Sequence, residues 1–281
     1  MSALLQYLIT GLGIGCAFAL VGSGLVAIYR VTHVVNFAQG AFAVVAAMTT
    51  STLLATGLPH GAAELTAVLL AACLGVLVGL VTIGRAGSIV ITLGMGVFAY
   101  AVEILLWGDQ PRSFAGLPGA VDLAGAVIQR HYLLIVTVTV LVFAGMALAF
   151  GRTYIGKALS ACADNPYAAK VVGINVKRMG LVSFAIGGAL GGLAGVLVTP
   201  VQQVTFDADV TLIVNGFAAA ILGGLTRPAV TLVGGLLLGI GQTMIAGYVG
   251  GAYQTEVTLV LMLTVMIVQA ARRSTLQEEP A

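Results

Sequence analysis

The stretch from Gly151 to Ala158, which reads GRTYIGKA, is the segment whose spacing comes closest to a known chemical motif. A phosphate-binding P-loop has a glycine, four residues and then Gly-Lys, followed by a Ser or Thr whose hydroxyl reaches the magnesium ion. Here Ala158 stands in the hydroxyl position, and the buried strand that should precede such a loop is missing. We therefore expect that this chain binds no nucleotide and does not hydrolyse ATP itself.

Other residues with chemical potential are scattered along the chain. The sequence holds three cysteines and three histidines, and none of them belongs to a cluster with metal-ligand spacing. We find no catalytic triad, no His-Glu-x-x-His within an apolar stretch and no paired aspartates there. The expectation is a protein that is not an enzyme and binds neither a metal ion nor a cofactor.

A run of polar residues opens the second apolar stretch, where the sequence reads Asn36-Phe37-Ala38-Gln39-Gly40. Asn36 and Gln39 are three residues apart and share one face of a helix. Amides in lipid are costly without partners, so both should point into a helix bundle. They either line a solute path or cap the helix and bond its neighbours, and the sequence leaves both readings open.

Three further polar residues lie inside apolar stretches. An ionisable residue within a membrane span is a functional hypothesis by default, which applies to Glu103, although its carboxylate lies near an outer end and could reach the interface. Asn215 and Gln242 are amides in later stretches. The residues that we expect along a solute path are Asn36, Phe37, Gln39, Gly40, Glu103 and Asn215, with Gln242 as a further candidate.

The composition identifies the elements that must position these residues. Of the 281 residues, 59% are hydrophobic and 8% are charged, and the mean hydropathy is +1.09. Soluble domains carry about 25% charged residues, and an apolar helix of roughly 20 residues spans a bilayer. We predict an all-α integral membrane protein, a single domain over 1–281 with about eight or nine transmembrane helices. The apolar segments are 4–29, 36–56, 64–83, 89–107, 132–150, 179–199, 211–225, 229–249 and 255–270, and 211–225 is short enough to be re-entrant or broken.

Basic residues set the orientation, because they favour the cytoplasmic side. Placing the loop 152–178 inside puts ten of the twelve Lys and Arg residues on the cytoplasmic side, with Arg112 and Arg130 left outside. The N-terminus is then outside, the C-terminus inside, and 108–131 forms an extracytoplasmic loop.

The loop 152–178 carries its own helix signals. Asn165 is a plausible N-cap with Pro166 at the first helical position, and Gly173 is a natural stop after a short helix over 166–172. We predict two short helices that meet at a sharp corner. They form either a rigid knob that seats in a partner's groove or an amphipathic loop that lies on lipid headgroups.

Three blocks of sequence carry a resemblance to a known family. They are GSGLVAIYRVTHVVNFAQGAF at 22–42, RTYIGKALSACADNPYAAKVVGINVKRM at 152–179 and NGFAAAILGGLTRPAVTLVGGLLLG at 215–239. With them the chain resembles the permease subunits of bacterial ABC importers for branched-chain amino acids, the LivH type.

The resemblance implies a permease subunit in a multi-pass arrangement in the bacterial cytoplasmic (inner) membrane. It implies a second permease, homologous or identical, two cytoplasmic ATPases that bind ATP and magnesium, and an extracytoplasmic solute-binding protein. Membrane lipid surrounds the chain, and nucleic acid has no part. The loop 152–178 would be the ATPase-coupling element. Its candidate residues, from family positions and helix signals together, are Gly156, Lys157, Ala158, Asp164, Asn165, Ala168, Ala169 and Gly173.

The chain departs from the family pattern at two candidate path residues. Gln39 stands where the family often has His, and Asn215 stands where Lys is common. The solute is therefore expected to be a branched-chain or a related amino acid. The alternative is an ATP-independent transporter or channel for a small polar solute such as urea, an amide or an organic acid. That alternative predicts a pair of charged residues within the membrane spans, and Glu103 is the single residue that could belong to one.

Overall fold

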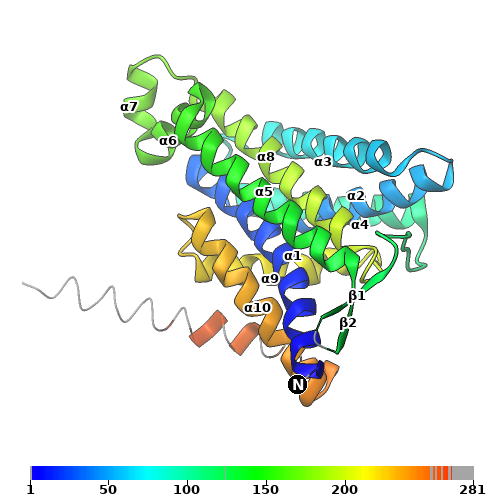
Figure 1. Cartoon of the computed structure of the whole chain (residues 1–281). Coiled ribbons are helices and arrows are strands. Elements are labelled where there is room, and N and C mark those ends of the chain that lie inside the picture. The colour runs from blue at the N-terminus through cyan, green and yellow to red at the C-terminus, as the bar shows by residue number, and fades with distance from the viewer. Residues whose placement is uncertain are drawn as a thin grey trace, which may run out of the picture.

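The computed structural model describes residues 2–123, 125–253, 256, 258–260, 262–264 and 267. It is a bundle of long helices with a small two-helix element at one end and a β-hairpin near the other (Figure 1). The helices are α1 Ser2–Thr32, α2 Gln39–Ala55, α3 His60–Thr82, α4 Ser88–Trp107, α5 Arg130–Arg152, α6 Tyr154–Asp164, α7 Pro166–Val171, α8 Val176–Val198, α9 Ala208–Leu222 and α10 Pro228–Tyr248, the strands are β1 Ala120–Leu123 and β2 Ala126–Gln129, and Gly251–Tyr253 is a 3-10 turn.

The predicted all-α membrane bundle is confirmed. In the described part of the chain, six helices are long and apolar enough to cross a membrane, namely α1, α3, α4, α5, α8 and α10, while α2 and α9 are apolar but shorter. These eight helices match the first eight predicted segments. Of the ninth, 255–270, half of the residues are described, namely 256, 258–260, 262–264 and 267, and these are helical.

The two short helices α2 and α9 begin inside the bundle. Thr32, at the end of α1, lies level with Gly180 near the start of α8. Gln39, the first residue of α2, instead donates from Nε2 to the carbonyl of Gly187 in the middle of α8, at 2.7 Å. The chain between these points therefore turns back into the bundle. A side chain at Gly40 would collide with the backbone carbonyl of Asp209, so the first turns of α2 and α9 meet there.

Glycine rows bring the central helices into backbone contact. Gly187, Gly191 and Gly195 of α8 face α1 and α2, and an added methyl at Gly195 would collide with the carbonyl of Ala43. The rows on α1 and α10 pack against each other in the same way, with Gly15 against the carbonyl of Gly235. In lipid, the hydrophobic effect does not drive two apolar helices together. Small residues instead let the backbones approach closely enough for extensive van der Waals contact.

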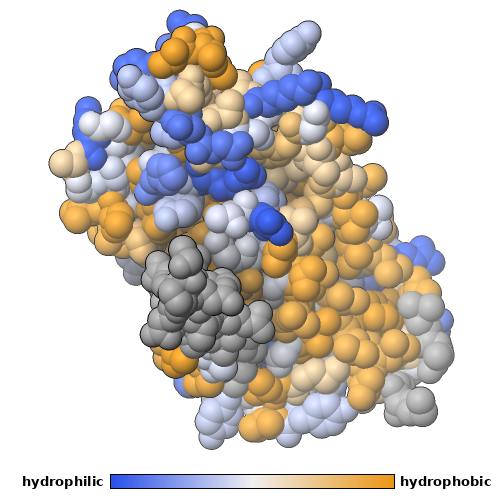
Figure 2. All heavy atoms as spheres, turned by 90° about the vertical axis from the view of Figure 1, so that its left-hand side faces the viewer, coloured by the Kyte–Doolittle hydropathy of each residue, from blue (hydrophilic) through white to orange (hydrophobic). Residues whose placement is uncertain are grey.

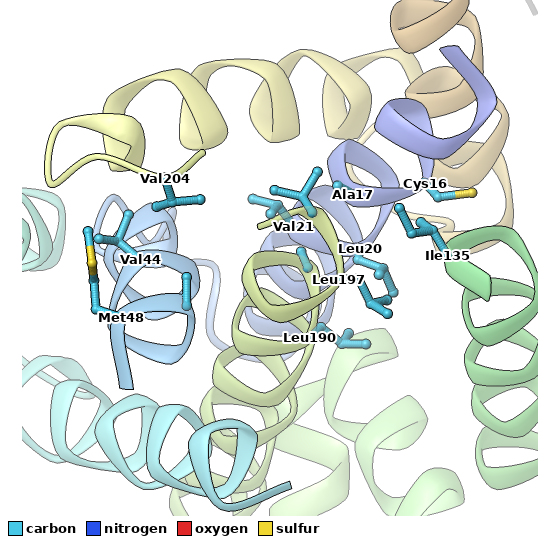
Figure 3. Packing of buried hydrophobic residues seen from close by; sticks show 13 residues of the cluster. Cys16, Ala17, Leu20, Val21, Val44, Met48, Ile135, Leu190, Leu197 and Val204 are labelled. Carbon is cyan, nitrogen blue, oxygen red and sulfur yellow. The ribbon is translucent and has the colours of Figure 1, made fainter. Parts of the chain in front are cut away.

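The largest buried cluster joins α1, α2, α5 and α8. Leu20, Val21, Val44, Ile135 and Leu197 are among its members, and their side chains converge between these four helices (Figure 3). Outside this core, α3, α4 and α5 present large apolar side chains on the surface. Figure 2 shows a broad hydrophobic surface over the lower part of one face and hydrophilic residues gathered toward the end that carries α6 and α7. This distribution suits a membrane-embedded body with a water-facing end.

The β-hairpin in the loop 108–131 has no counterpart in the sequence predictions. Its strands pair antiparallel, with Ala120 opposite Gln129, and the turn contains Gly125 with φ of +83°. Ala126 and Ile128 are buried while Val127 and Gln129 are exposed. Strands of four residues are too short for that alternation to stand out in the sequence.

Replacing Gly195 with Ala should destabilise the bundle, because the methyl meets the α2 backbone, which cannot move aside cheaply. We expect a loss of about 1–3 kcal/mol, the usual cost of overpacking. Thermal unfolding of the purified chain in mild detergent measures it. Gly241→Ala is the matched control, because nothing lies within 4 Å of the added methyl at that helical position. Equal melting temperatures for the two variants would contradict the close contact at Gly195.

Candidate functional site

The helices α6 and α7 form the predicted corner, and local capping explains its shape. Thr153 caps α6 by accepting a hydrogen bond from the amide of Gly156 at 3.0 Å. Asn165 ends α6 and caps α7, its Oδ1 accepting from the amide of Ala168 at 3.0 Å, with Pro166 at the first helical position. Gly173 has φ of +89° and ends the turn after α7 in the left-handed conformation that suits glycine.

A small apolar cluster anchors this corner to the membrane helices. Leu159 and Cys162 of α6 and Ala169 of α7 pack with Val31 at the end of α1, and Met179 of α8 covers them. Burial raises the pKa of the Cys162 thiol, which therefore stays neutral within the cluster. We call Val31, Leu159, Cys162 and Ala169 the anchor cluster. It ties the two short helices to α1 and α8.

The outer face of the corner is apolar and exposed. Tyr154 is 93% exposed, Tyr167 78%, Val171 72% and Val172 75%. These side chains lie on a segment that projects beyond the ends of the long helices (Figure 1). Exposed apolar side chains on a segment outside a membrane body indicate a candidate binding surface. We call Tyr154, Tyr167, Val171 and Val172 the outer face.

The predicted coupling residues divide between these two sides. Ala168, Lys157 and Asp164 are exposed, whereas Ala169 is buried and Gly156 packs so closely on the end of α5 that a side chain would collide with the carbonyl of Ala149. Ala169 is buried because α7 turns it toward the anchor cluster, and the coupling role of Ala168 and Ala169 stays a prediction. Ala158 is half-buried, and Asn165 and Gly173 shape the corner.

Sequence reasoning also missed the two tyrosines of the outer face. Tyr154 and Tyr167 each stand at the start of a short helix in a loop rich in basic residues. Aromatic residues are enriched at protein interfaces, so the presence of tyrosines in such a loop is the signal that could have identified them.

Asn36 and Gln39 are buried completely, and their amides bond within the protein. Asn36 donates from Nδ2 to Oε1 of Gln39 at 3.3 Å, and its Oδ1 accepts from the amide of Ala38 at 3.2 Å. Gln39 donates to Gly187 of α8, as described above. Asn36 thus precedes α2 and shapes its start, while Phe37 lies against Phe217 of α9, with ring centroids 6.2 Å apart. Gln39 therefore fastens α2 to α8, while a place for these amides along a solute path stays a prediction.

A polar cavity of about 370 Å³ lies between α1, α9 and α10 and the segment that precedes α9. Asn215 and Gln242 both line it, and Gln242 donates from Nε2 to Oδ1 of Asn215 at 2.7 Å and also to the hydroxyl of Thr258. Gln202 and Asp207 line the same cavity from the segment before α9. The structure thus brings together two candidate path residues that are 27 positions apart. Hydrogen-bonding groups around such a space suit a small polar solute.

Glu103 does not line the polar cavity. Thr92 and Glu103 are the buried residues of α4, and Glu103 is 1% exposed. Neither of its carboxylate oxygens has a hydrogen-bond partner among the residues that the structure describes. Gly40 and Asp209 mark where α2 and α9 meet. The predicted path residues therefore lie in separate places, with Asn215 at the polar cavity, Asn36, Gln39 and Gly40 at the start of α2, and Glu103 on α4.

Comparison of the sequence with protein families gives one consistent answer. The family model described as branched-chain amino acid transport system permease component matches residues 7–270. The permease protein BraD of the high-affinity branched-chain amino acid transport system of Pseudomonas aeruginosa is 28% identical, over 94% of this chain and 93% of the relative. A probable branched-chain amino acid transport permease, LivH of Methanocaldococcus jannaschii, is 30% identical over 89% of this chain and 85% of the relative.

A solved structure shares the fold. PsaBC from Streptococcus pneumoniae, in complex with a Fab, aligns with a TM-score of 0.54 and 13% identity, covering 94% of this chain and 91% of the other. At this identity the likeness concerns the arrangement of helices alone.

Removing the cap at the corner should loosen α7. We expect Asn165→Ala to cost about 1 kcal/mol locally, so that amide exchange across residues 166–171 becomes about fivefold faster. Hydrogen–deuterium exchange read by mass spectrometry measures this, and Lys157→Ala, an exposed change on α6, is the control. Unchanged exchange in α7 would show that the cap does not hold the corner.

Proposed function

Because the chain belongs to the family of branched-chain amino acid transport permease components, we propose that it is the membrane-spanning subunit of an ATP-driven importer. It is a multi-pass protein of the cytoplasmic (inner) membrane and one component of a multi-subunit transport system. The solute that we propose is a branched-chain or related amino acid. The two relatives described above are named for transport of branched-chain amino acids, and polar groups lie within the helix bundle of this chain.

The outer face of the α6–α7 corner is the observation that supports this proposal most strongly. Tyr154, Tyr167, Val171 and Val172 are largely exposed on the side that basic residues mark as cytoplasmic. A partner protein that covers them would gain apolar burial at a rigid, capped corner. We assign this partner as one of two cytoplasmic ATPases, which hold the ATP and magnesium that this chain does not bind.

The anchor cluster supplies a mechanical link for alternating access. Movement of an ATPase against the outer face would displace α6 and α7, and Leu159 and Ala169 would pass that displacement to α1 and α8. Those two helices hold the starts of α2 and α9 through Gln39, Gly187 and Gly40. Rocking them would open the path first to one side of the membrane and then to the other.

Other partners complete the proposed importer. A second permease, identical or homologous, would cover part of the apolar surface on α3 and α4, where Leu69, Val90 and Phe98 are exposed. An extracytoplasmic binding protein would deliver the solute near the polar cavity. A permease supplied in this way needs little affinity of its own, which fits the weak, passing contacts that Asn215 and Gln242 offer.

Placing a charge on the outer face should separate this chain from its ATPases. We expect Tyr167→Asp and Val171→Asp each to lower recovery of the ATPase in mild-detergent co-purification by about tenfold or more, because a central apolar contact becomes a buried unpaired charge. Val127→Asp, on the exposed face of the extracytoplasmic hairpin, is the matched control and should leave recovery unchanged.

Two results would contradict the proposal. The first is equal loss of ATPase in the Val127→Asp control. The second is transport of solute by the purified chain alone, in liposomes without ATP, which would identify a stand-alone carrier or channel instead.

A further inference from the structure

A second cavity, of about 540 Å³, lies beside the α6–α7 corner and is separate from both the outer face and the polar cavity. Three parts of the chain enclose it. They are the end of α1 with the residue that follows it, the end of α6, and the connection from α9 to α10. The lining residues are Tyr29, Arg30, His33, Ala163, Asp164 and 225–229.

The depth of this cavity follows from the helix ends around it. In that region α1 ends at Thr32, α9 ends at Leu222 and α10 begins at Pro228. Helices that cross a bilayer end near its headgroups, so the cavity lies at headgroup depth on the cytoplasmic side. Tyr29 also suits that depth, because tyrosine favours the membrane interface.

The cavity is cationic, and its arginines are unpaired. Arg30 is half-buried and Arg227 is exposed, and neither guanidinium has a hydrogen bond or ion pair with any residue that the structure describes. His33 adds a third basic group. Asp164 lines the same space without pairing with either arginine. Pro228 opens α10, whose N-terminal end contributes a partial positive charge. An anionic group would therefore be attracted to this space.

The cavity walls also hold uncommon backbone conformations. In the described part of the chain, the non-glycine residues with positive φ are His33, at 55°, and Leu225, at 58°. Both line this cavity. Such conformations cost energy and cluster at functional sites, where the surroundings maintain them.

We propose that this cavity binds the phosphate headgroup of an anionic phospholipid from the cytoplasmic leaflet. Arg30 and Arg227 would contact the phosphate from two different elements, with the acyl chains remaining among the neighbouring helices. Because Ala163 and Asp164 belong to the end of α6, the bound lipid would brace the corner against α1 and the α9–α10 connection. The site would make the stiffness of the coupling corner depend on membrane composition.

Spin-labelled lipids test this on the purified chain alone, reconstituted in phosphatidylcholine. Electron paramagnetic resonance compares the motionally restricted fraction of labelled phosphatidylglycerol with that of labelled phosphatidylcholine. Wild-type protein should prefer phosphatidylglycerol, and Arg30→Gln with Arg227→Gln should lower that preference by about fivefold for each arginine removed. The control is Lys177→Gln with Arg178→Gln, which removes the same charge from exposed positions outside the cavity.

The outcomes distinguish a lipid headgroup from a soluble anion, and each of them either supports or overturns the proposal. Retained preference in the control and lost preference in the Arg30/Arg227 variant, with unchanged thermal unfolding, would support it. Displacement of the lipid by millimolar inorganic phosphate would overturn it, because it would assign the cavity to a soluble anion. Equal loss in both variants, or no preference in the wild type, would also overturn it. None of these readouts requires the proposed importer function.

Discussion

The close crossing of α1 over α8 is the contact on which the rest of the structure depends. A side chain at Gly24 would meet the carbonyl of Gly187, and one at Gly187 would meet Ile28 of α1, so glycine alone allows this approach. In lipid there is little hydrophobic gain from pairing two apolar helices, and backbone proximity with van der Waals packing takes its place. Once α1 and α8 are set, Gln39 can reach the carbonyl of Gly187, and that bond fixes where α2 starts.

This arrangement connects the two ends of the molecule. At the end that we propose to be cytoplasmic, the anchor cluster attaches α6 and α7 to the same two helices that cross at the centre. In the middle, the first turns of α2 and α9 meet at Gly40 and Asp209. Toward the outer side, Asn215 and Gln242 line the polar cavity. A displacement of the corner therefore has a continuous packed route to the groups that surround the proposed solute path.

Part of this was predictable from the sequence, and the rest depends on contacts between distant residues. Long apolar stretches identified the spanning helices, and Asn165, Pro166 and Gly173 identified the corner, because these signals are local. The depth at which α2 begins was not predictable, since Asn36 and Gln39 indicate burial in the bundle and the partner of Gln39, the carbonyl of Gly187, lies far away in the sequence. The pairing of Asn215 with Gln242 was not predictable either, because it joins residues of two different helices. The inward face of α7, which buries Ala169, is set by packing against Val31 on α1.

The central claim is that the anchor cluster transmits movement from the corner to the membrane helices, and Leu159→Ala tests it most directly. The change removes buried apolar volume, a loss of about 2–5 kcal/mol in typical cores, and leaves the outer face intact. The measurement is ATP hydrolysis and uptake of labelled leucine in proteoliposomes that contain the chain, its ATPases and its binding protein. The account predicts that the ATPases still bind and hydrolyse ATP while uptake is largely lost. Uptake that remains in proportion to ATP hydrolysis would contradict it.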